Sequence, residues 1–532
     1  MRRRISFHVG LGALVSTLAS TGLSLATAAT IPVTNTADSG AGSLRAAIAS
    51  ATNGDTIDAT GISGMITLTS GELWISNSLT VLGPGPASLA INGNYPTTTN
   101  GVFVVWKSGT VSVSGLTITN GHRSLGGGIG CVQSTLTVSN CIIAGNSTDT
   151  AGGGLLIDGI SGSANATIIN SILTGNTAGA GGAIYNWGEQ GFSTLTVVGS
   201  IISSNSASLG ASIKNDGDPS GNAMAFITNS TISGNSGGDG GGLYNDGTGS
   251  TLNVVDSTLS SNSASKGGGI YQNDAFSAGT SLVRLINTTV SGNSSSGYGG
   301  GIANGFIGGG ANTVILISST FSSNSAPHGA NLYNVSSSTN AIQIGNTILN
   351  TDGTGTNIVT FVGGITSLGY NLCSDDGSGF LTNATDQINT NPLLGPLQDN
   401  GGPVFTHALL AGSPAIDQGK NLSGDATDAR GFPRTFDDPA IPNAAGGDGT
   451  DIGAFEAFEL LITAVNRLGN DLQLSFTSLV GRNYELQSRS DLSSATWTPL
   501  PGSIPGNGSI AQATVTNAFS QPQQFYQVHQ LP

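Results

Sequence analysis

Apolar and polar residues alternate along most of the chain, and the alternation recurs in a repeated unit. The segment TLNVVDSTLSSNSASKGGGIY at 251–271 shows one copy, in which Leu252 and Val254 alternate with polar residues before an Asn and a glycine-rich tetrad. A period of two residues is typical of strands with one buried face. The repeats lack the i, i+3, i+4 spacing of an amphipathic helix. The pattern therefore predicts short strands joined by tight corners.

Seven copies of this unit occupy residues 134–334. They are marked by a recurring Asn, which stands at Asn146, Asn176, Asn205, Asn235, Asn262, Asn293 and Asn324. A fixed period of about 30 residues indicates a solenoid of stacked coils. The sequence thus predicts an all-β fold, a right-handed parallel β-helix of pectate-lyase-like architecture, with the hand that parallel crossovers prefer. About ten coils are expected between residues 65 and 362, stacked about 4.8 Å apart.

Both constant features of the unit have structural explanations. The glycine tetrads, such as GGGI at 267–270, predict corners that need positive φ or a close backbone approach. The recurring Asn is expected to adopt the left-handed conformation at a corner and to form a ladder of amide hydrogen bonds along the stack. A row of ligand-binding amides is the alternative, and it requires the column to face solvent.

Two of the tetrad and Asn motifs match a known family closely. GGAI at 181–184 and FSSN at 321–324 are the signatures of polymorphic outer-membrane protein repeats, although Ile, Leu or Val replaces Phe in the other copies. The chain resembles that family over residues 126–334. The resemblance implies a surface-exposed β-helical passenger without enzyme chemistry.

The amino-terminal segment predicts export. Residues 1–28 combine three arginines, an apolar stretch and the small residues ATA, as a secretory signal peptide does. No later apolar run of about 20 residues is long enough to span a membrane. We expect an exported protein at the outer cell surface or outside the cell.

A short helix is expected next, over residues 43–51. Ser43 is a suitable N-cap, and Leu44, Ala47 and Ile48 share one face. Residues 29–125 are predicted to hold this helix as an N-terminal cap together with irregular first coils, and residues 126–368 to hold the regular repeats. GSLRAAI resembles a motif at the start of many exported bacterial β-helix proteins, with Gly42 in place of the family's Cys and Ala46 in place of its Glu.

The composition changes at about residue 369. Residues 369–456 contain 12 of the chain's 30 acidic residues and the phrases NPLLGPLQDNGGPVFTHALLAGSPAID, TDARGFPR and GDGTDIGAFE. They resemble the choice-of-anchor Q domain, which implies a C-terminal cap of the β-helix without catalysis. Residues 457–532 alternate between short strand patterns and turns, which predicts a small antiparallel β-sandwich.

The net charge limits the classes of possible partner, and the cysteine count limits the possible disulfides. The formal net charge is −15, and only 8% of residues are charged, which argues against binding to nucleic acid or to anionic membranes. The cysteines are Cys131, Cys141 and Cys373, and their odd number leaves at least one unpaired inside the chain. Cys131 and Cys141 are expected near each other, either as a disulfide or as two buried thiols.

Catalysis on a β-helix needs converging titratable groups. Glycosidases use paired carboxylates, and lyases use carboxylates with Ca²⁺ and a base. By repeat alignment Asp216 and Asp246 stack on neighbouring coils, where we expect solvated turn residues, with a Ca²⁺ or substrate row as the alternative. His122 and Arg123 form an isolated Gly-His-Arg without the companion signatures of pectin hydrolases.

The acidic C-terminal region offers one more candidate. Asp425, Asp428, Asp448 and Asp451 could collect a calcium ion, although loops capped by their own backbone amides are the favoured interpretation. No catalytic, cofactor or metal site is therefore predicted.

These observations favour a secreted or surface-exposed, structural or adhesin-like β-helix without catalytic activity. Its expected partner is an extracellular glycan or a matrix or surface protein. The alternatives are a β-helix that binds or degrades polysaccharides and a matrix protein stabilised by Ca²⁺.

Overall fold

A computed structural model provides the structure of the protein. It describes residues 28–531 apart from 108, 218–219, 274–279, 306–311, 337, 339–340, 354, 439, 459, 461, 479–481, 492–495, 508–509 and 521–522. Residues 1–27, which carry nearly all of the predicted signal peptide, lie outside the described residues.

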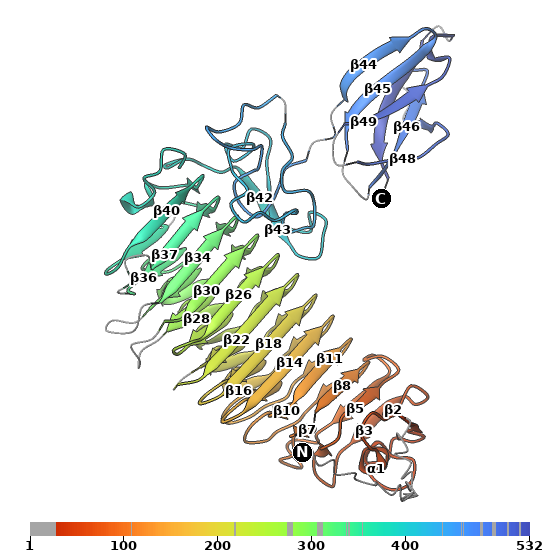
Figure 1. Ribbon diagram of the computed structural model, residues 1–532, viewed down its shortest axis with the longest axis vertical. Helices are drawn as coiled ribbons and strands as arrows, with labels where there is room; N and C mark the ends of the chain where they lie inside the picture. The colour runs from red at the N-terminus through yellow and green to blue at the C-terminus, as the bar shows by residue number, and fades with distance from the viewer. Residues whose placement is uncertain are drawn as a thin grey trace, which may run out of the picture.

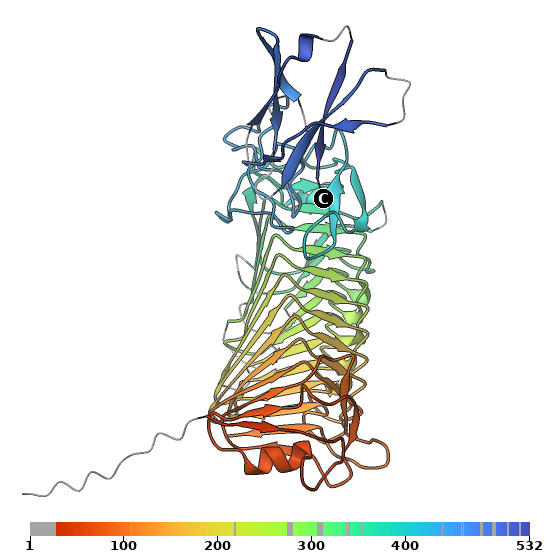
Figure 2. The same ribbon diagram turned by 90° about the vertical axis from the view of Figure 1, so that its right-hand side faces the viewer.

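The chain winds into a parallel β-helix whose coils stack along one axis (Figures 1 and 2). Sheet A consists of β1 (Thr30–Pro32), β2 (Thr56–Asp58), β5 (Leu79–Leu82), β8 (Thr110–Ser114), β11 (Thr135–Ser139), β14 (Ser163–Ile169), β18 (Phe192–Val198), β22 (Asn222–Thr228), β26 (Thr251–Val255), β30 (Leu282–Ile286), β34 (Thr313–Ile317), β37 (Ile342–Gly345) and β40 (Ile365–Gly369). Sheet B consists of β3 (Gly64–Thr67), β6 (Leu89–Asn92), β9 (Thr117–Thr119), β12 (Ile142–Ala144), β15 (Ile172–Thr174), β19 (Ile201–Ser203), β23 (Thr231–Ser233), β27 (Thr258–Ser260), β31 (Thr289–Ser291), β35 (Thr320–Ser322), β38 (Ile348–Asn350) and β41 (Leu372–Cys373).

Two further parallel sheets complete the coils. Sheet C consists of β4 (Leu73–Ile75), β7 (Phe103–Trp106), β10 (Ile129–Val132), β13 (Leu155–Asp158), β17 (Ile184–Trp187), β21 (Ile213–Asp216), β25 (Leu243–Asp246), β29 (Ile270–Asn273), β33 (Ile302–Asn304), β36 (Leu332–Asn334) and β39 (Ile358–Thr360). Sheet D is shorter and consists of β16 (Thr177–Ala180), β20 (Ser206–Leu209), β24 (Ser236–Asp239), β28 (Ser263–Lys266) and β32 (Ser294–Tyr298). The predicted parallel β-helix is confirmed. Sheet C has 11 strands within the described residues, one more than the ten coils expected.

The core is the inside of the coils. In β18 the side chains of Ser193, Leu195 and Val197 are buried, while the intervening residues point outward. Leu195 lies in register between Ala166 and Ala225 of the neighbouring coils. Each fully buried Leu or Ile stabilises the fold by about 1.5–3 kcal/mol relative to an exposed one.

The Asn ladder is confirmed, and all seven side chains are buried. Asn235 Nδ2 donates to Asn262 Oδ1 at 2.9 Å, and the Asn235 backbone N–H donates to the same oxygen at 3.1 Å. The expectation that these Asn residues adopt the left-handed conformation is wrong. The residue before each Asn adopts it, as at Gly234 (φ 63°) and Ser261 (φ 54°). That residue makes the bend, so the Asn side chain can point into the coil and along the stack.

The glycine tetrads form the corners between sheets D and C. Gly267 has a φ of 60°, and a Cβ there would lie 2.2 Å from the carbonyl oxygen of Ile270. Both reasons for glycine, positive φ and close backbone approach, therefore apply at this corner.

Helix α1 (Leu44–Ser50) covers the first end of the solenoid, as predicted (Figure 2). Ser43 caps it by accepting a hydrogen bond from the Ala46 N–H at 3.2 Å. Leu44 and Ile48 are buried against the first coils. Arg45 fixes the helix by an ion pair with Asp38 at 2.6 Å.

The region after sheet A covers both the last coil and one side of the solenoid. Beside the 3₁₀-turn η1 (Gly377–Gly379), Phe380 and Leu381 pack against the end of the core. The hairpin β42 (Leu394–Gln398) and β43 (Thr406–Leu409) and the loops up to residue 457 lie along the outer face of sheet B (Figure 1). This lateral packing was not expected from the sequence.

The last residues form antiparallel sheets around a core of their own, as predicted. One sheet holds β44 (Ile462–Leu468), β45 (Asp471–Thr477) and β49 (Ile510–Val515), and the other holds β46 (Asn483–Arg489), β47 (Thr498–Pro499), β48 (Ile504–Pro505) and β50 (Phe525–Gln530), with a 3₁₀-turn η2 at Ala518–Ser520. Phe476 and Tyr484 are fully buried between them.

Candidate functional site

The outward side chains of sheet C, together with the loops and the last residues of the sheet D strands that lead into it, form what we call the sheet C face. The first and third residues of each strand point into the coil, as Ile184 and Asn186 do in β17, so the second and fourth point outward. The second positions of successive strands hold the aligned side chains of Tyr185, Lys214, Tyr244, Tyr271, Ala303 and Tyr333. An aromatic column interrupted by Lys214 and Ala303 therefore runs along this face.

Lys214 lies at the centre of a polar cluster on the sheet C face. Its Nζ is 2.8 Å from Asp216 Oδ2 and 3.0 Å from Asp246 Oδ2. The ammonium also lies 5.4 Å from the ring centre of Tyr185 and 5.3 Å from that of Tyr244. One buried cation thus ties three neighbouring coils together.

The surroundings decide the protonation of this cluster. Burial lowers the pKa of Lys214, but the charges of Asp216 and Asp246 outweigh that effect and raise it above its ordinary value. Burial raises the pKa of Asp246 and raises the phenol pKa of both Tyr185 and Tyr244 well above the usual range. The lysine is therefore charged and the tyrosines are protonated at neutral pH.

The prediction of Asp216 and Asp246 as solvated turn residues is wrong. Their stacking on neighbouring coils is confirmed, because they pair in register in β21 and β25. Asp216 is buried, and it accepts a hydrogen bond from the Tyr185 hydroxyl at 2.5 Å. The strands continue through the Asn-Asp pair before the chain turns, which places both carboxylates beside Lys214.

Aromatic rings are exposed on the sheet C face near its N-terminal end. Trp74 and Trp106 are 51% and 41% exposed, with their ring centres 6.1 Å apart. Lys107 lies over the ring of Trp106 at 5.5 Å, and Arg123 lies over that of Trp74 at 5.7 Å. We call this group the N-terminal aromatic platform.

Of the predicted candidates, Arg123 belongs to this platform, whereas His122 lies in line with the sheet D strands through bridges that join it to Ser147 and Ser147 to Thr177. The His122 ring stacks on Tyr95 at 4.2 Å, and its Nδ1 is 2.8 Å from the hydroxyl oxygen of Ser147. Arg123 points to Glu72 at 3.9 Å. Each side chain therefore has its own partner, and the two do not form an acid–base pair.

A cleft of about 200 Å³ opens near the other end of the sheet C face. It is lined by Lys266, Tyr271, Tyr298, Ala303, Gly305, Tyr333 and Val335. The rings of Tyr298 and Tyr333 lie 4.7 Å apart, and Tyr298 is 38% exposed. Lys266 lies over the ring of Tyr271 and binds Asp239 at 2.9 Å. We call this group the C-terminal aromatic platform.

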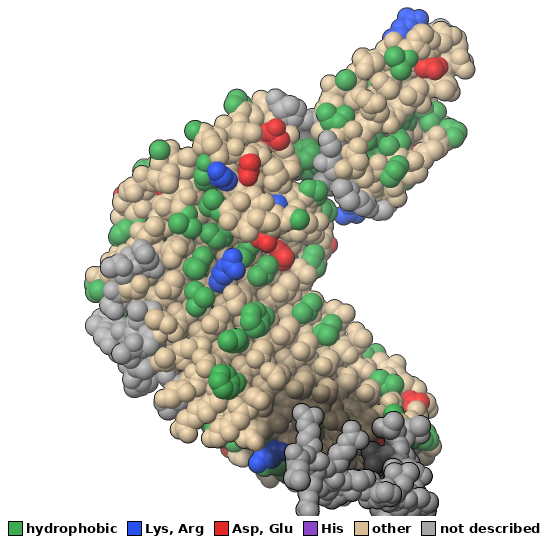
Figure 3. Space-filling view, in the orientation of Figure 1, with side chains coloured by type: hydrophobic (Ala, Val, Ile, Leu, Met, Phe, Trp, Pro, Cys, Tyr) green, Lys and Arg blue, Asp and Glu red, His purple; other side chains and the backbone are tan. Residues whose placement is uncertain are grey.

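The sheet C face also gathers the solenoid's cations. The bases between residues 101 and 362 are Lys107, Arg123, Lys214, Lys266 and Arg284, all of them described. Arg284 alone among these five lies on sheet A. The side of the molecule that shows sheet A carries scattered apolar side chains and few charges (Figure 3).

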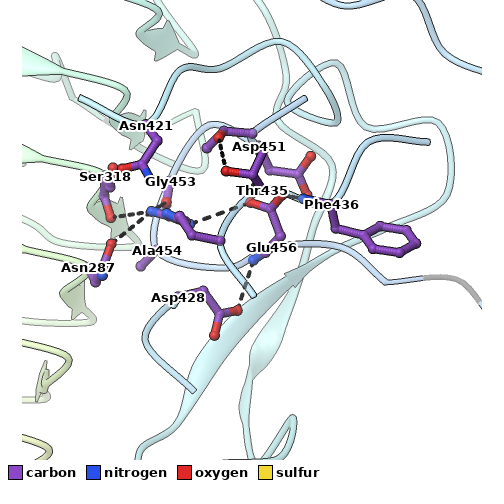
Figure 4. Close-up of polar contacts among 12 residues, drawn as sticks. Asn287, Ser318, Asn421, Asp428, Thr435, Phe436, Asp451, Gly453, Ala454 and Glu456 are labelled. Carbon is purple, nitrogen blue, oxygen red and sulfur yellow. Dashed lines mark hydrogen bonds and ion pairs between the residues drawn. The ribbon is translucent and has the colours of Figure 1, made fainter. Parts of the chain in front are cut away.

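Three of the four acids proposed as a calcium cluster, Asp428, Asp448 and Asp451, bind protein groups with their carboxylates. Asp428 accepts from Arg430 Nε at 2.8 Å and from the Glu456 N–H at 3.0 Å (Figure 4). Asp451 accepts from the Asp417 N–H at 2.8 Å. Asp448 accepts from the backbone N–H groups of Asn421 and Thr450, and a hydrogen bond from the Asn421 side chain reaches the carbonyl oxygen of Asp425. Capping by amides of the same loop is thus confirmed for Asp428 and Asp448, whereas Asp451 is capped by the N–H of Asp417, 34 residues earlier.

Arg434, the last residue of the segment TDARGFPR, anchors the C-terminal region to the solenoid. It is fully buried, and its Nη2 donates to Asn287 Oδ1 at 2.9 Å and to the Ser318 carbonyl at 3.2 Å (Figure 4). Nη1 lies 3.8 Å from Glu456 Oε2. The phrases TDARGFPR and GDGTDIGAFE thus fix this region to the corners between sheets A and B.

All three cysteines of the chain are described, and each is a buried free thiol. Cys131 and Cys141 donate to backbone carbonyls rather than pairing with each other. Burial raises the pKa of Cys131 to about 12 and that of Cys141 to about 11. These thiols fill core positions and are protonated at neutral pH.

Sequence reasoning missed the aromatic column, although a signal for it exists. The residue directly after each tetrad takes the second position of a sheet C strand. It is tyrosine in four of the seven copies, at Tyr185, Tyr244, Tyr271 and Tyr333.

The described part of the chain shows neither a metal-binding cluster nor a helix able to span a membrane. No three His, Cys, Asp or Glu side chains there converge as a metal site requires. None of the helices in that part has the length and apolar character to cross a membrane. A comparison with family models and with curated proteins finds no match to this chain.

Proposed function

We propose that the protein is an exported, surface-exposed β-helix of the adhesin-like class that binds a neutral glycan along the sheet C face and cleaves no glycosidic bond. The fold fits both surface proteins and proteins that act on polysaccharides. The aromatic platforms favour binding, and the chemistry of the charged groups argues against cleavage.

The observation that carries the proposal is the placement of exposed rings at both ends of one face. Seven strand spacings separate β7, which holds Trp106, from β33, which lies beside Tyr298. At about 4.8 Å each, this is about 34 Å. Aromatic side chains offer large apolar surfaces with polar edges, which suit the apolar faces of sugar rings. An extended chain of sugars could contact both platforms at once.

The charges on this face favour a neutral ligand. Lys214 is neutralised by two aspartates, Lys266 by Asp239, and Arg123 faces Glu72. A uronate or sulfated glycan would have to displace these acids to reach Lys214, Lys266 or Arg123, whereas Lys107 lies over the Trp106 ring. The overall charge of −15 adds repulsion at long range.

The central cluster lacks the groups that glycan cleavage needs. Glycosidases place two carboxylates on either side of the scissile bond, but here Asp216 and Asp246 both bind the ammonium of Lys214. A lyase needs an unprotonated base near the sugar, and Lys214 and the neighbouring phenols keep their protons. We infer that the cluster stabilises the coils beneath the binding face.

A glycan array with the purified mature chain tests the proposal. We expect neutral polysaccharides to bind and uronate-rich ones to bind weakly. Trp106→Ala and Tyr298→Ala should each weaken binding at least tenfold. Phe192→Ala is a matched control, because Phe192 is 60% exposed but lies on sheet A. Equal losses in all three variants, or a preference for uronates, would contradict the proposal.

Export and the absence of cleavage have separate tests. Fractionation of cells that produce the full chain should find the protein outside the cytoplasm without residues 1–28. Incubation with the bound polysaccharides should release neither reducing ends nor unsaturated products, with or without calcium. Release that Asp216→Asn abolishes would replace the binding proposal with an enzymatic one.

A further inference from the structure

A second cleft, of about 810 Å³, lies between the outer face of sheet B and the β42–β43 hairpin. Its sheet B side holds Ser291, Ser322 and Asn350, which are in register on successive strands. The opposite wall holds His407 and the apolar side chains of Leu397 and Leu410. This cleft is remote from the sheet C face, and the proposed glycan binding does not use it.

Ser291 and His407 meet at this cleft. His407 Nε2 lies 2.9 Å from the hydroxyl oxygen of Ser291, and His407 Nδ1 lies 2.8 Å from the carbonyl oxygen of Gly395. A carbonyl oxygen only accepts hydrogen bonds, so Nδ1 carries the proton. Nε2 is then unprotonated and accepts the hydroxyl proton of Ser291.

The imidazole is held in the form that a general base requires. Burial lowers the pKa of His407 below its ordinary value, against smaller opposing effects of Gly395 and Asp352. The ring is neutral at neutral pH, and the Gly395 carbonyl fixes its tautomer and orientation. A hydroxyl, a base within hydrogen-bond reach and a group that orients the base are the signature of an activated nucleophile.

We propose that Ser291 and His407 form a nucleophile–base pair that hydrolyses short-chain acyl esters of polyhydroxylated alcohols bound in this cleft. Leu397 and Leu410 provide an apolar wall for the acyl group. Asn350 and Asp352, whose side chains hydrogen-bond each other at 3.0 Å, also line the cleft and supply polar groups for the alcohol. Ser322 lies in register with Ser291 on the next strand, one strand spacing of about 4.8 Å away, and we assign its hydroxyl to donate to the oxyanion.

The reaction balances with water as the second substrate. The Ser291 oxygen attacks the acyl carbon while its proton moves to His407 Nε2. The ester C–O bond then breaks, and the leaving alkoxide takes that proton and departs as the alcohol. Water attacks the acyl-serine, transfers a proton to His407, and the carboxylic acid leaves as the Ser291 oxygen is protonated again.

Covalent labelling tests the proposal on the unmodified full chain. A fluorophosphonate probe should form an adduct that peptide mass spectrometry places on Ser291, and 4-nitrophenyl acetate should be hydrolysed with an acyl-enzyme burst. Ser291→Ala should abolish both signals. Ser260→Ala is the matched control, because Ser260 lies in register with Ser291 on the neighbouring sheet B strand but does not line the cleft, and it should keep both signals.

The base has its own test. His407→Gln should slow labelling about 100-fold or more, the range of general-base catalysis, while circular dichroism and the unfolding midpoint establish that the variant is folded. Because the wild-type adduct needs no variant, misfolding of a mutant leaves the test intact. A folded wild-type chain without an adduct on Ser291, or with equal labelling of several serines, would overturn the proposal, and the bond would then only tether the hairpin.

Discussion

Replacing Asn235 with alanine removes one rung of the Asn ladder. The side chain is fully buried and makes four hydrogen bonds. Its Nδ2 donates to Asn262 Oδ1 at 2.9 Å and to the Ile202 carbonyl at 3.1 Å, and its Oδ1 accepts from Asn205 Nδ2 at 3.0 Å and from the Asn205 N–H at 2.9 Å. At about 1 kcal/mol net for each bond, and with buried partners left unsatisfied, we expect a loss of about 4 kcal/mol.

Hydrogen exchange measured by mass spectrometry suits this prediction, because a solenoid can open locally. Amides of the coils that contain Asn205 and Asn262 should exchange about a thousandfold faster in the variant, which corresponds to about 4 kcal/mol. Asn253→Ala is the matched control, since Asn253 points outward from β26 and is half-buried. If the amides of the neighbouring coils exchange as slowly in Asn235→Ala as in Asn253→Ala, the ladder does not stabilise the stack.

Three further changes test other parts of the structure. Lys214→Met leaves two buried aspartates without their cation and should destabilise the fold by about 3–5 kcal/mol in urea unfolding, and replacing both aspartates with Asn should restore stability. Gly267→Ala should cost more stability than Gly234→Ala in the same assay, because both residues have positive φ but only the first would bring a Cβ against backbone. Burial raises the pKa of Asp417 and of Asp451 to about 7, above the unfolded value near 4. Between these pH values the folded state binds more protons than the unfolded state. The C-terminal region should therefore be most stable near pH 4 and lose stability as pH rises to 7. A thermal midpoint that rises between pH 5 and 7.5 would contradict this.

The coils were predictable because each repeat carries the same local sequence features, which are alternating apolar residues, an Asn and a glycine-rich tetrad. The phase of the Asn residues sets the period, and each buried amide satisfies its hydrogen bonds on the amide and the backbone of equivalent coils. Gly267 illustrates the corners, where backbone geometry alone demands glycine. Ser43 and Leu44 likewise specify their helix through local capping and one apolar face.

The polar cluster was not predictable from local patterns, because its members come from different coils. The Asn-Asp pair at 215–216 resembles a turn in isolation. Its burial depends on Tyr185 one coil before and on Tyr244 and Asp246 one coil after, whose alignment becomes visible only in three dimensions.

The position of the C-terminal region was hidden for the same reason. Its sequence motifs predict a cap, but they do not predict which face of the solenoid the cap covers. Arg434 reaches Asn287, which lies 147 residues earlier in the chain. Ser291 and His407 are separated by 116 residues, so no spacing in the sequence marks them as a pair.

Calorimetric titration with neutral oligosaccharides of increasing length tests the central claim most directly. If one glycan chain lies along the sheet C face, affinity should rise with length until the ligand spans about 34 Å between the platforms, and then level off. The double variant Trp106→Ala/Tyr298→Ala should lose this dependence, while Phe192→Ala should retain it. Affinity that is independent of length in the wild-type chain, or unchanged in the double variant, would contradict the assignment of the sheet C face as the binding surface.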